Sequence, residues 1–241
     1  MKALALATLT AMLTLAYAAP RAADGTLAPF IAEYEVRYGN LTVGSSRTEL
    51  ARGAQPGRWT IESQSNARGF ARIIASGTLS QRSQFDADAA GLRPHSYRFD
   101  DGTKRTGRDV TLEFDWRAGR VTGVAEDEPI NVAVEPGLQD AASIQALVMM
   151  RLRAGGEPGA ISMIEKDRIK RYHYTLLRSE RLKTAIGEYD TVVYRSARDG
   201  SSRETFSWYA PALGYALLRA EQHRDGDRTF QTQIRSYQPG G

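Results

Sequence analysis

The side chains in this sequence that could form a binding site are mostly aromatic. Tyrosine, tryptophan and phenylalanine recur at alternate positions of several apolar runs. The set comprises Tyr34, Tyr38, Trp59, Phe114, Trp116, Tyr172, Tyr174, Phe206, Trp208 and Phe230. Such large apolar surfaces either fill a core or line a cavity for an apolar ligand. The sequence leaves both roles open, because core aromatics and cavity aromatics follow the same alternation.

Five of these residues are our candidates for a ligand-binding wall: Trp59, Trp116, Tyr172, Tyr174 and Trp208. Small curved β-sheets can hold one apolar ligand against their inner face. The predicted ligand is therefore a lipid or another apolar molecule.

The sequence contains no local motif for catalysis or cofactor binding. His95, His173 and His223 are not at metal-ligand spacing, and there is no cysteine. A Gly-x-Ser-x-Gly elbow and a glycine-rich phosphate loop are also missing. We therefore assign no catalytic residue, no metal ligand and no cofactor. One enzymatic alternative stays open, because the two carboxylates of a glycosidase can come from distant strands.

The first eighteen residues have the pattern of a secretory signal peptide. Lys2 supplies a positive charge, an apolar run extends from Ala3 to Leu15, and Ala16-Tyr17-Ala18 gives a small-x-small cleavage pattern. We expect cleavage near Ala18 and a periplasmic location. Residues 19–29 then form a linker, and residues 30–241 form one β-rich domain.

The charge pattern argues against a nucleic-acid-binding protein. The net charge is +4, and residues of both signs are mixed along the chain. Nucleic-acid-binding domains instead carry a basic patch or stripe. After signal removal we expect no integral membrane span, since a spanning helix needs about 20 apolar residues. The partner could also be an envelope protein, and the pattern predicts no particular oligomeric state.

Period-two alternation predicts β-strands through most of the chain. Clear examples run from Ala32 to Tyr38, from Val110 to Trp116 and from Tyr172 to Leu176. Gly39-Asn40 and Asp225-Gly226-Asp227 predict hairpin turns between strands. From roughly ten to twelve short strands we predict an all-β (mainly β) fold, an antiparallel meandering sheet curled into a barrel or half-barrel.

One segment, Asp140 to Ala154, has helical rather than strand spacing. Asp140 is a good N-cap residue, and Gly155 suits the position after the last turn. We predict one central helix packed on the sheet. Its expected buried residues are Ile144, Leu147, Val148 and Leu152.

Several short segments together resemble a known family. They are Tyr34-Glu35-Val36, Leu41-Thr42-Val43-Gly44, Leu138-Gln139-Asp140, Ile186-Gly187-Glu188-Tyr189-Asp190 and Trp208-Tyr209-Ala210-Pro211-Ala212-Leu213-Gly214-Tyr215. In this order they resemble a family of exported bacterial proteins of unknown function, domain of unknown function 3108. Family members usually have Asp-Pro-Leu-Ser before the helix, and this chain has Asp140-Ala141-Ala142-Ser143. It also has Ala216 where a proline is common. The family carries no established activity and so implies no catalytic residue. A further similarity to lipoprotein carriers implies a sheet bent around a hydrophobic cavity.

These observations favour a non-enzymatic periplasmic envelope protein that binds an apolar ligand or assists envelope assembly. Two alternatives remain. The first is a hydrolase of a glycan or cell-wall polymer with carboxylates from separate strands. The second is a structural partner of an outer-membrane complex that binds through a sheet edge.

Overall fold

The computed structural model describes residues 26–69, 77–88, 90–103 and 107–240. The expected signal peptide, residues 1–18, lies outside the described residues, as does the expected linker up to residue 25. Within the described ranges, no helix is long and apolar enough to cross a membrane.

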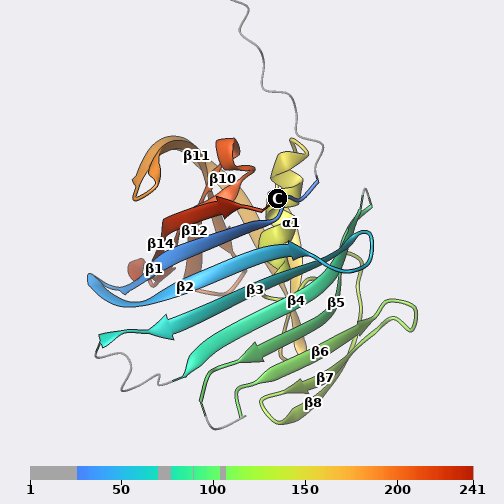
Figure 1. Cartoon of the computed structure of the whole chain (residues 1–241). Coiled ribbons are helices and arrows are strands. Elements are labelled where there is room, and N and C mark those ends of the chain that lie inside the picture. The colour runs from blue at the N-terminus through green and yellow to red at the C-terminus, as the bar shows by residue number, and fades with distance from the viewer. Residues whose placement is uncertain (1–25, 70–76, 89, 104–106, 241) are drawn as a thin grey trace, which may run out of the picture.

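The fold is one antiparallel sheet with fourteen strands in the described residues (Figure 1). Eight strands precede the α-helix: β1 (Phe30–Tyr38), β2 (Leu41–Arg52), β3 (Arg58–Ala67), β4 (Thr78–Asp88), β5 (Gly91–Asp100), β6 (Val110–Asp115), β7 (Arg120–Ala125) and β8 (Glu128–Ala133). The helix α1 (Ser143–Arg153) is followed by β9 (Ala160–Glu165), β10 (Arg168–Thr184), β11 (Gly187–Ala197), β12 (Arg203–Ala210), a short 3₁₀ turn η2 (Pro211–Leu213), β13 (Ala216–Arg224) and β14 (Asp227–Pro239).

The sheet is a meander in which the first and last strands of the chain are neighbours in the middle of the sheet. β1 pairs with β14, so the spatial order runs from β8 through β1 and β14 to β9 without closing. The curled sheet confirms the expected half-barrel architecture. The chain has more strands than the expected ten to twelve. The edge strands β8 and β9 are only six residues long, too short to show a clear alternation.

The β9 edge of the open sheet is partly protected. At β9, Gln139 forms a parallel bridge with Met163, donates its N–H to Ser162 O and accepts from Ile164 N–H. The β7–β8 and β9–β10 turns meet through Lys166 Nζ and Glu126 Oε2, 2.6 Å apart. This exposed ion pair contributes little energy, but it shows that the two edge hairpins lie near each other.

Hairpin turns follow from local residue chemistry. Asp225 and Gly226, between β13 and β14, have φ of 53° and 89°. Two consecutive positive φ values match the twist of antiparallel strands, and Asp-Gly adopts them readily. The turn predicted at this position is therefore present.

The predicted helix begins later than expected, at Ser143 instead of Asp140. Asp140 Oδ1 accepts hydrogen bonds from the backbone N–H groups of Ala142 and Ser143, at 2.9 and 2.7 Å. The carboxylate thus accepts hydrogen bonds from N–H groups at the start of the helix that have no partner within it, which is the stabilising role of a cap. Gly155, at φ of 77°, follows the last turn as predicted.

The helix packs inside the curl of the sheet (Figure 1) and contacts β4 and β5. Of the four residues expected to be buried, Leu147, Val148 and Leu152 are buried, whereas Ile144 is only half-buried. The largest fully buried apolar side chains of the described residues include Phe30, Phe85, Leu50, Ile61, Leu112, Leu138, Ile161, Leu218 and Ile234. The three buried helix residues belong to the same hydrophobic cluster as these side chains.

Candidate functional site: a cavity between the hairpin ends and the helix

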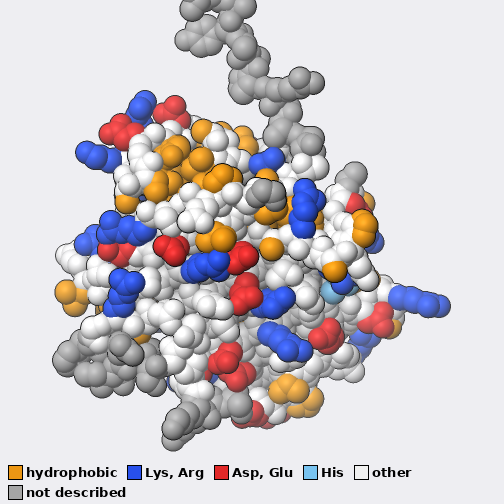
Figure 2. All heavy atoms as spheres, in the orientation of Figure 1, with side chains coloured by type: hydrophobic (Ala, Val, Ile, Leu, Met, Phe, Trp, Pro, Cys, Tyr) orange, Lys and Arg blue, Asp and Glu red, His pale blue; other side chains and the backbone are white. Residues whose placement is uncertain are grey.

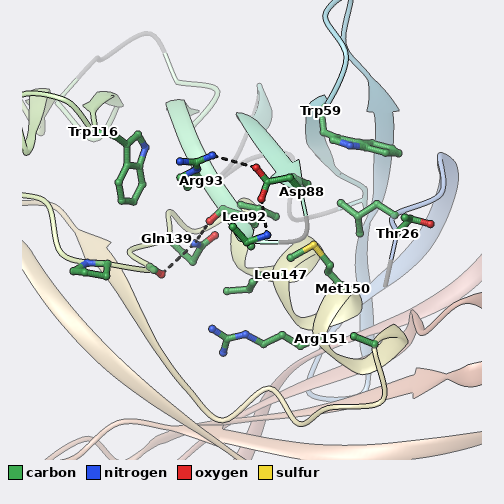
Figure 3. A pocket seen from close by; sticks show the side chains of 18 of the residues that line it. Thr26, Trp59, Asp88, Leu92, Arg93, Trp116, Gln139, Leu147, Met150 and Arg151 are labelled. Atoms are coloured by element: carbon green, nitrogen blue, oxygen red, sulfur yellow. Dashed lines mark hydrogen bonds and ion pairs between the residues drawn. The ribbon is translucent and has the colours of Figure 1, made fainter. Parts of the chain in front are cut away.

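A cavity of about 1110 Å³ lies where three hairpin ends meet the helix (Figure 3). Its walls come from the β2–β3, β4–β5 and β6–β7 ends, the segment between β8 and α1, and α1 itself. Pockets for small molecules typically measure about 300 to 1000 Å³. The cavity is therefore large enough for a drug-sized or lipid-sized ligand.

One stripe of α1 forms a wall of this cavity. Leu147, Met150, Arg151 and Ala154 line it, and their spacing of three, four and seven residues places them on one face of the helix. Val148 is fully buried and does not line the cavity. The helix thus has two apolar sides, one packed on the core and one facing the cavity.

Two tryptophans face the helix across the cavity. Trp59 on β3 is 4 % exposed, and the Arg52 guanidinium lies 4.6 Å from the centre of its ring. Trp116, just after β6, donates its indole N–H to Pro94 O at 2.6 Å and stacks on Phe114. Fixed indoles of this kind provide a rigid apolar surface for a ligand.

The polar part of the lining is mainly basic. Arg52, Arg93 and Arg151 line the cavity, and Asp88 is the one carboxylate among the described lining residues. Asp88 is paired with Arg93 at 3.2 Å. Arg151 is half-buried, and burial lowers the pKa of its guanidinium below the ordinary value. Its described hydrogen bond goes to the carbonyl of Pro158.

Gln139 is a fully buried polar residue in the cavity wall. Its side-chain Nε2 donates to the carbonyls of Leu92, Gly137 and Leu138, at 3.2, 3.1 and 3.0 Å. These contacts fix the orientation of the amide. Its Oε1 has no hydrogen-bond partner among the described residues.

A smaller cavity of about 280 Å³ adjoins the first and shares Pro136, Gly137 and Arg151 with it. Glu135 and Arg171 add one charge of each sign to its wall. Arg151 therefore stands between two hollow regions.

The other three candidate residues do not line the cavity. Tyr172 is half-buried and donates its hydroxyl to Glu165. Burial raises the pKa of Tyr174 to about 12. Trp208 is buried and donates to Glu180, and the guanidinium groups of Arg178 and Arg219 lie 6.0 and 5.4 Å from the centre of its ring. The structure thus brings Trp59 and Trp116 together in one cavity and places Tyr172, Tyr174 and Trp208 elsewhere.

Sequence reasoning missed the polar half of the lining. Arg52 pairs in register with Trp59 across β2 and β3, and a hairpin prediction with correct register could have linked them. Arg151 follows Leu147 by four residues on the predicted helix face, a second readable signal. No sequence pattern distinguishes the buried Gln139 from an exposed glutamine.

Three aspartates also gather outside the cavity. Carboxylate oxygens of Asp100, Asp101 and Asp109 lie within 4.8 Å of one another. Two accept backbone N–H groups in the turn after β5, from Gly102 and Thr103, as expected of turn aspartates. Elsewhere, acidic and basic side chains are interspersed over the face shown in Figure 2.

The open half-barrel with an internal helix and an end cavity defines a β-barrel-like protein. The chain belongs to the family described as protein of unknown function (DUF3108), whose family model matches residues 33–231. This confirms the resemblance drawn from the sequence motifs.

A comparison with solved structures finds matches at low sequence identity. A β-barrel-like protein of domain of unknown function DUF1849 from Brucella abortus is 11 % identical, with a TM-score of 0.59, and the alignment covers 89 % of this chain and 98 % of that one. A candidate lipoprotein from Parabacteroides distasonis is 8 % identical, with a TM-score of 0.39 and coverage of 88 % and 96 %. A candidate exported protein with a YmcC-like fold from Bacteroides fragilis is 7 % identical, with a TM-score of 0.34 and the same coverage. A search of curated proteins finds no match.

Proposed function

We propose that this protein is an exported, non-enzymatic envelope protein that binds a lipid or another apolar ligand in the cavity beside α1. The observation that carries the proposal is the cavity of about 1110 Å³, with Trp59, Trp116, Leu147 and Met150 in its wall. Apolar walls with a few fixed polar groups are typical of ligand sites. The signal-peptide pattern of residues 1–18 supports export.

The cavity favours binding over hydrolysis. Glycosidases use two carboxyl groups on opposite sides of the scissile bond. Among the described lining residues Asp88 is the one carboxylate, and its ion pair with Arg93 occupies it. The sheet edges also argue against strand addition, since Gln139 pairs with β9 and β8 contains Pro129, which has no N–H to donate.

Tryptophan quenching by a dibrominated stearoyl ligand tests the proposal, because bromine quenches indole fluorescence only at short range. The chain has three tryptophans, two in the cavity wall and one elsewhere. Two double variants of matched composition separate these positions. Trp59→Phe with Trp208→Phe retains only Trp116 and should be quenched saturably. Trp59→Phe with Trp116→Phe retains only Trp208 and should not be quenched.

Equal quenching of both variants would place the ligand outside the cavity. No quenching of either variant, with both folded by circular dichroism, would reject a lipid-binding role. Native mass spectrometry of the purified protein adds an independent measurement, since a bound lipid appears as a defined mass increment.

A further inference from the structure

The charges in the cavity wall point to the chemistry of the ligand's head group. Arg52 and Arg151 have no carboxylate within ion-pair distance among the described residues. Arg52 stacks on Trp59, and Arg151 donates to the Pro158 carbonyl. Arg52 is exposed, whereas Arg151 is half-buried. A half-buried guanidinium without a counter-ion is costly, because desolvation is not offset by a partner charge. An anion in the cavity would supply that partner.

We infer that the cavity binds an anionic amphiphile whose acyl chain lies against Trp59, Trp116 and Leu147. Arg52 and Arg151 bind its carboxylate or phosphate. This inference rests on the proposed function and adds the head-group class. Charged hydrogen bonds from arginine are about twice as strong as neutral ones, so the head group should contribute strongly to selection.

The test compares three ligands that share one dibrominated stearoyl chain, using the full mature chain. They are the free fatty acid, the lysophosphatidylglycerol and the neutral monoacylglycerol. Both anions should bind about tenfold or more tightly than the neutral lipid, because each charged hydrogen bond is worth roughly one such factor.

Variants assign the preference to residues. Arg52→Gln and Arg151→Gln should each reduce anion affinity about tenfold and reduce monoacylglycerol affinity much less. Arg52 is exposed at the end of β2, so its variant should fold even if Arg151→Gln does not. Arg224→Gln, an exposed arginine that does not line the cavity, is the matched control and should change nothing.

Each contrary result has a distinct meaning. If the wild-type protein binds all three ligands equally, the head-group inference fails while the lipid-binding function stands. If anion preference survives in both arginine variants, these residues are not the head-group site. If none of the ligands binds, the proposed function itself is wrong.

Discussion

The most unusual single residue of the core is Asp140, a carboxylate with no exposed surface. Ser83 Oγ donates to its Oδ2 at 2.6 Å, and two backbone N–H groups bind its Oδ1. Burial raises the pKa of Asp140 to about 6 from an ordinary value of 3.8, although these hydrogen bonds oppose the rise. The residue that positions the helix is therefore also a source of pH-dependent stability.

Replacing this carboxylate should change how stability depends on pH. A raised pKa in the folded state means that folded Asp140 binds a proton more tightly than unfolded Asp140. The contribution of this raised pKa to the unfolding free energy is therefore fully present below about pH 4 and is lost as the pH rises through about 6. Asp140→Asn keeps an oxygen for capping but removes the titration. Between pH 3.5 and 7, the unfolding free energy of Asp140→Asn should therefore rise by about 3 kcal/mol relative to that of the wild type.

Urea denaturation across this pH range measures the difference between the two proteins. Carboxylates with lowered pKa values, such as Asp86 and Glu204, give the opposite trend in both proteins and cancel in the comparison. Parallel stability curves for wild type and Asp140→Asn would contradict the expectation.

The candidate site was predictable only in its aromatic half. Alternation identified Trp59 and Trp116 as inward-facing residues, and the cavity contains both. The same alternation selected Trp208, whose surroundings are Arg178, Arg219 and Glu180 instead. Alternation tells which face of a strand a residue occupies. It does not tell which faces of distant strands surround the same space, because that depends on how the sheet curls.

At the scale of elements, one side of α1 packs on the core and another side lines the cavity. Leu152 is buried and absent from the cavity wall, whereas Leu147 is buried but lines it. Removing side-chain volume should cost more where neighbours surround the residue on all sides. The two leucines therefore provide a matched comparison within one helix.

Leu152→Ala should destabilise the protein by about 2 to 5 kcal/mol, the range for large-to-small changes in a packed core. Leu147→Ala should fall near the lower end of that range, since part of its environment is already empty. The same change should weaken quenching by the dibrominated lipid, while Leu152→Ala should leave it intact. Chemical denaturation and quenching measure the two effects. A larger loss of stability for Leu147→Ala than for Leu152→Ala would contradict this assignment of the packed side of the helix.

Element prediction succeeded where local patterns were long or strongly punctuated. The helix, the Asp225-Gly226 turn and the central strands carry such patterns. β10 was underestimated because its 17 residues include a register shift between Leu176 and Arg178. A bulge reverses the alternation partway along the strand, so a period-two search recognises only part of it.

At the scale of the whole molecule, the open sheet links ligand binding to overall stability. The cavity collects residues from β2, β3, β4, β5 and α1, so a ligand that fills it contacts segments far apart in the chain. Unfolding separates these segments and destroys the site. A ligand that binds only the folded state must therefore stabilise it by mass action.

Saturating lysophosphatidylglycerol should raise the thermal midpoint of the wild-type protein. At a ligand concentration about 100 times the dissociation constant, the gain is about 2.7 kcal/mol, or roughly 5 to 10 °C for a chain of this size. The Arg52→Gln, Arg151→Gln double variant should show a much smaller shift at the same concentration. Calorimetry below the critical micelle concentration measures both. An equal shift in the two proteins would indicate non-specific stabilisation by the lipid.

The protein can meet an envelope lipid only if it is exported from the cytoplasm. Ala16-Tyr17-Ala18 has the small residues that signal peptidase requires at the two positions flanking Tyr17. We expect protein isolated from the periplasmic fraction to begin at Ala19, as measured by N-terminal sequencing. Ala16→Arg with Ala18→Arg should block cleavage and leave a membrane-associated precursor. A chain that still begins at Met1 in the cytoplasm would contradict export. It would also separate the cavity from the envelope lipids that its arginines and tryptophans are proposed to bind.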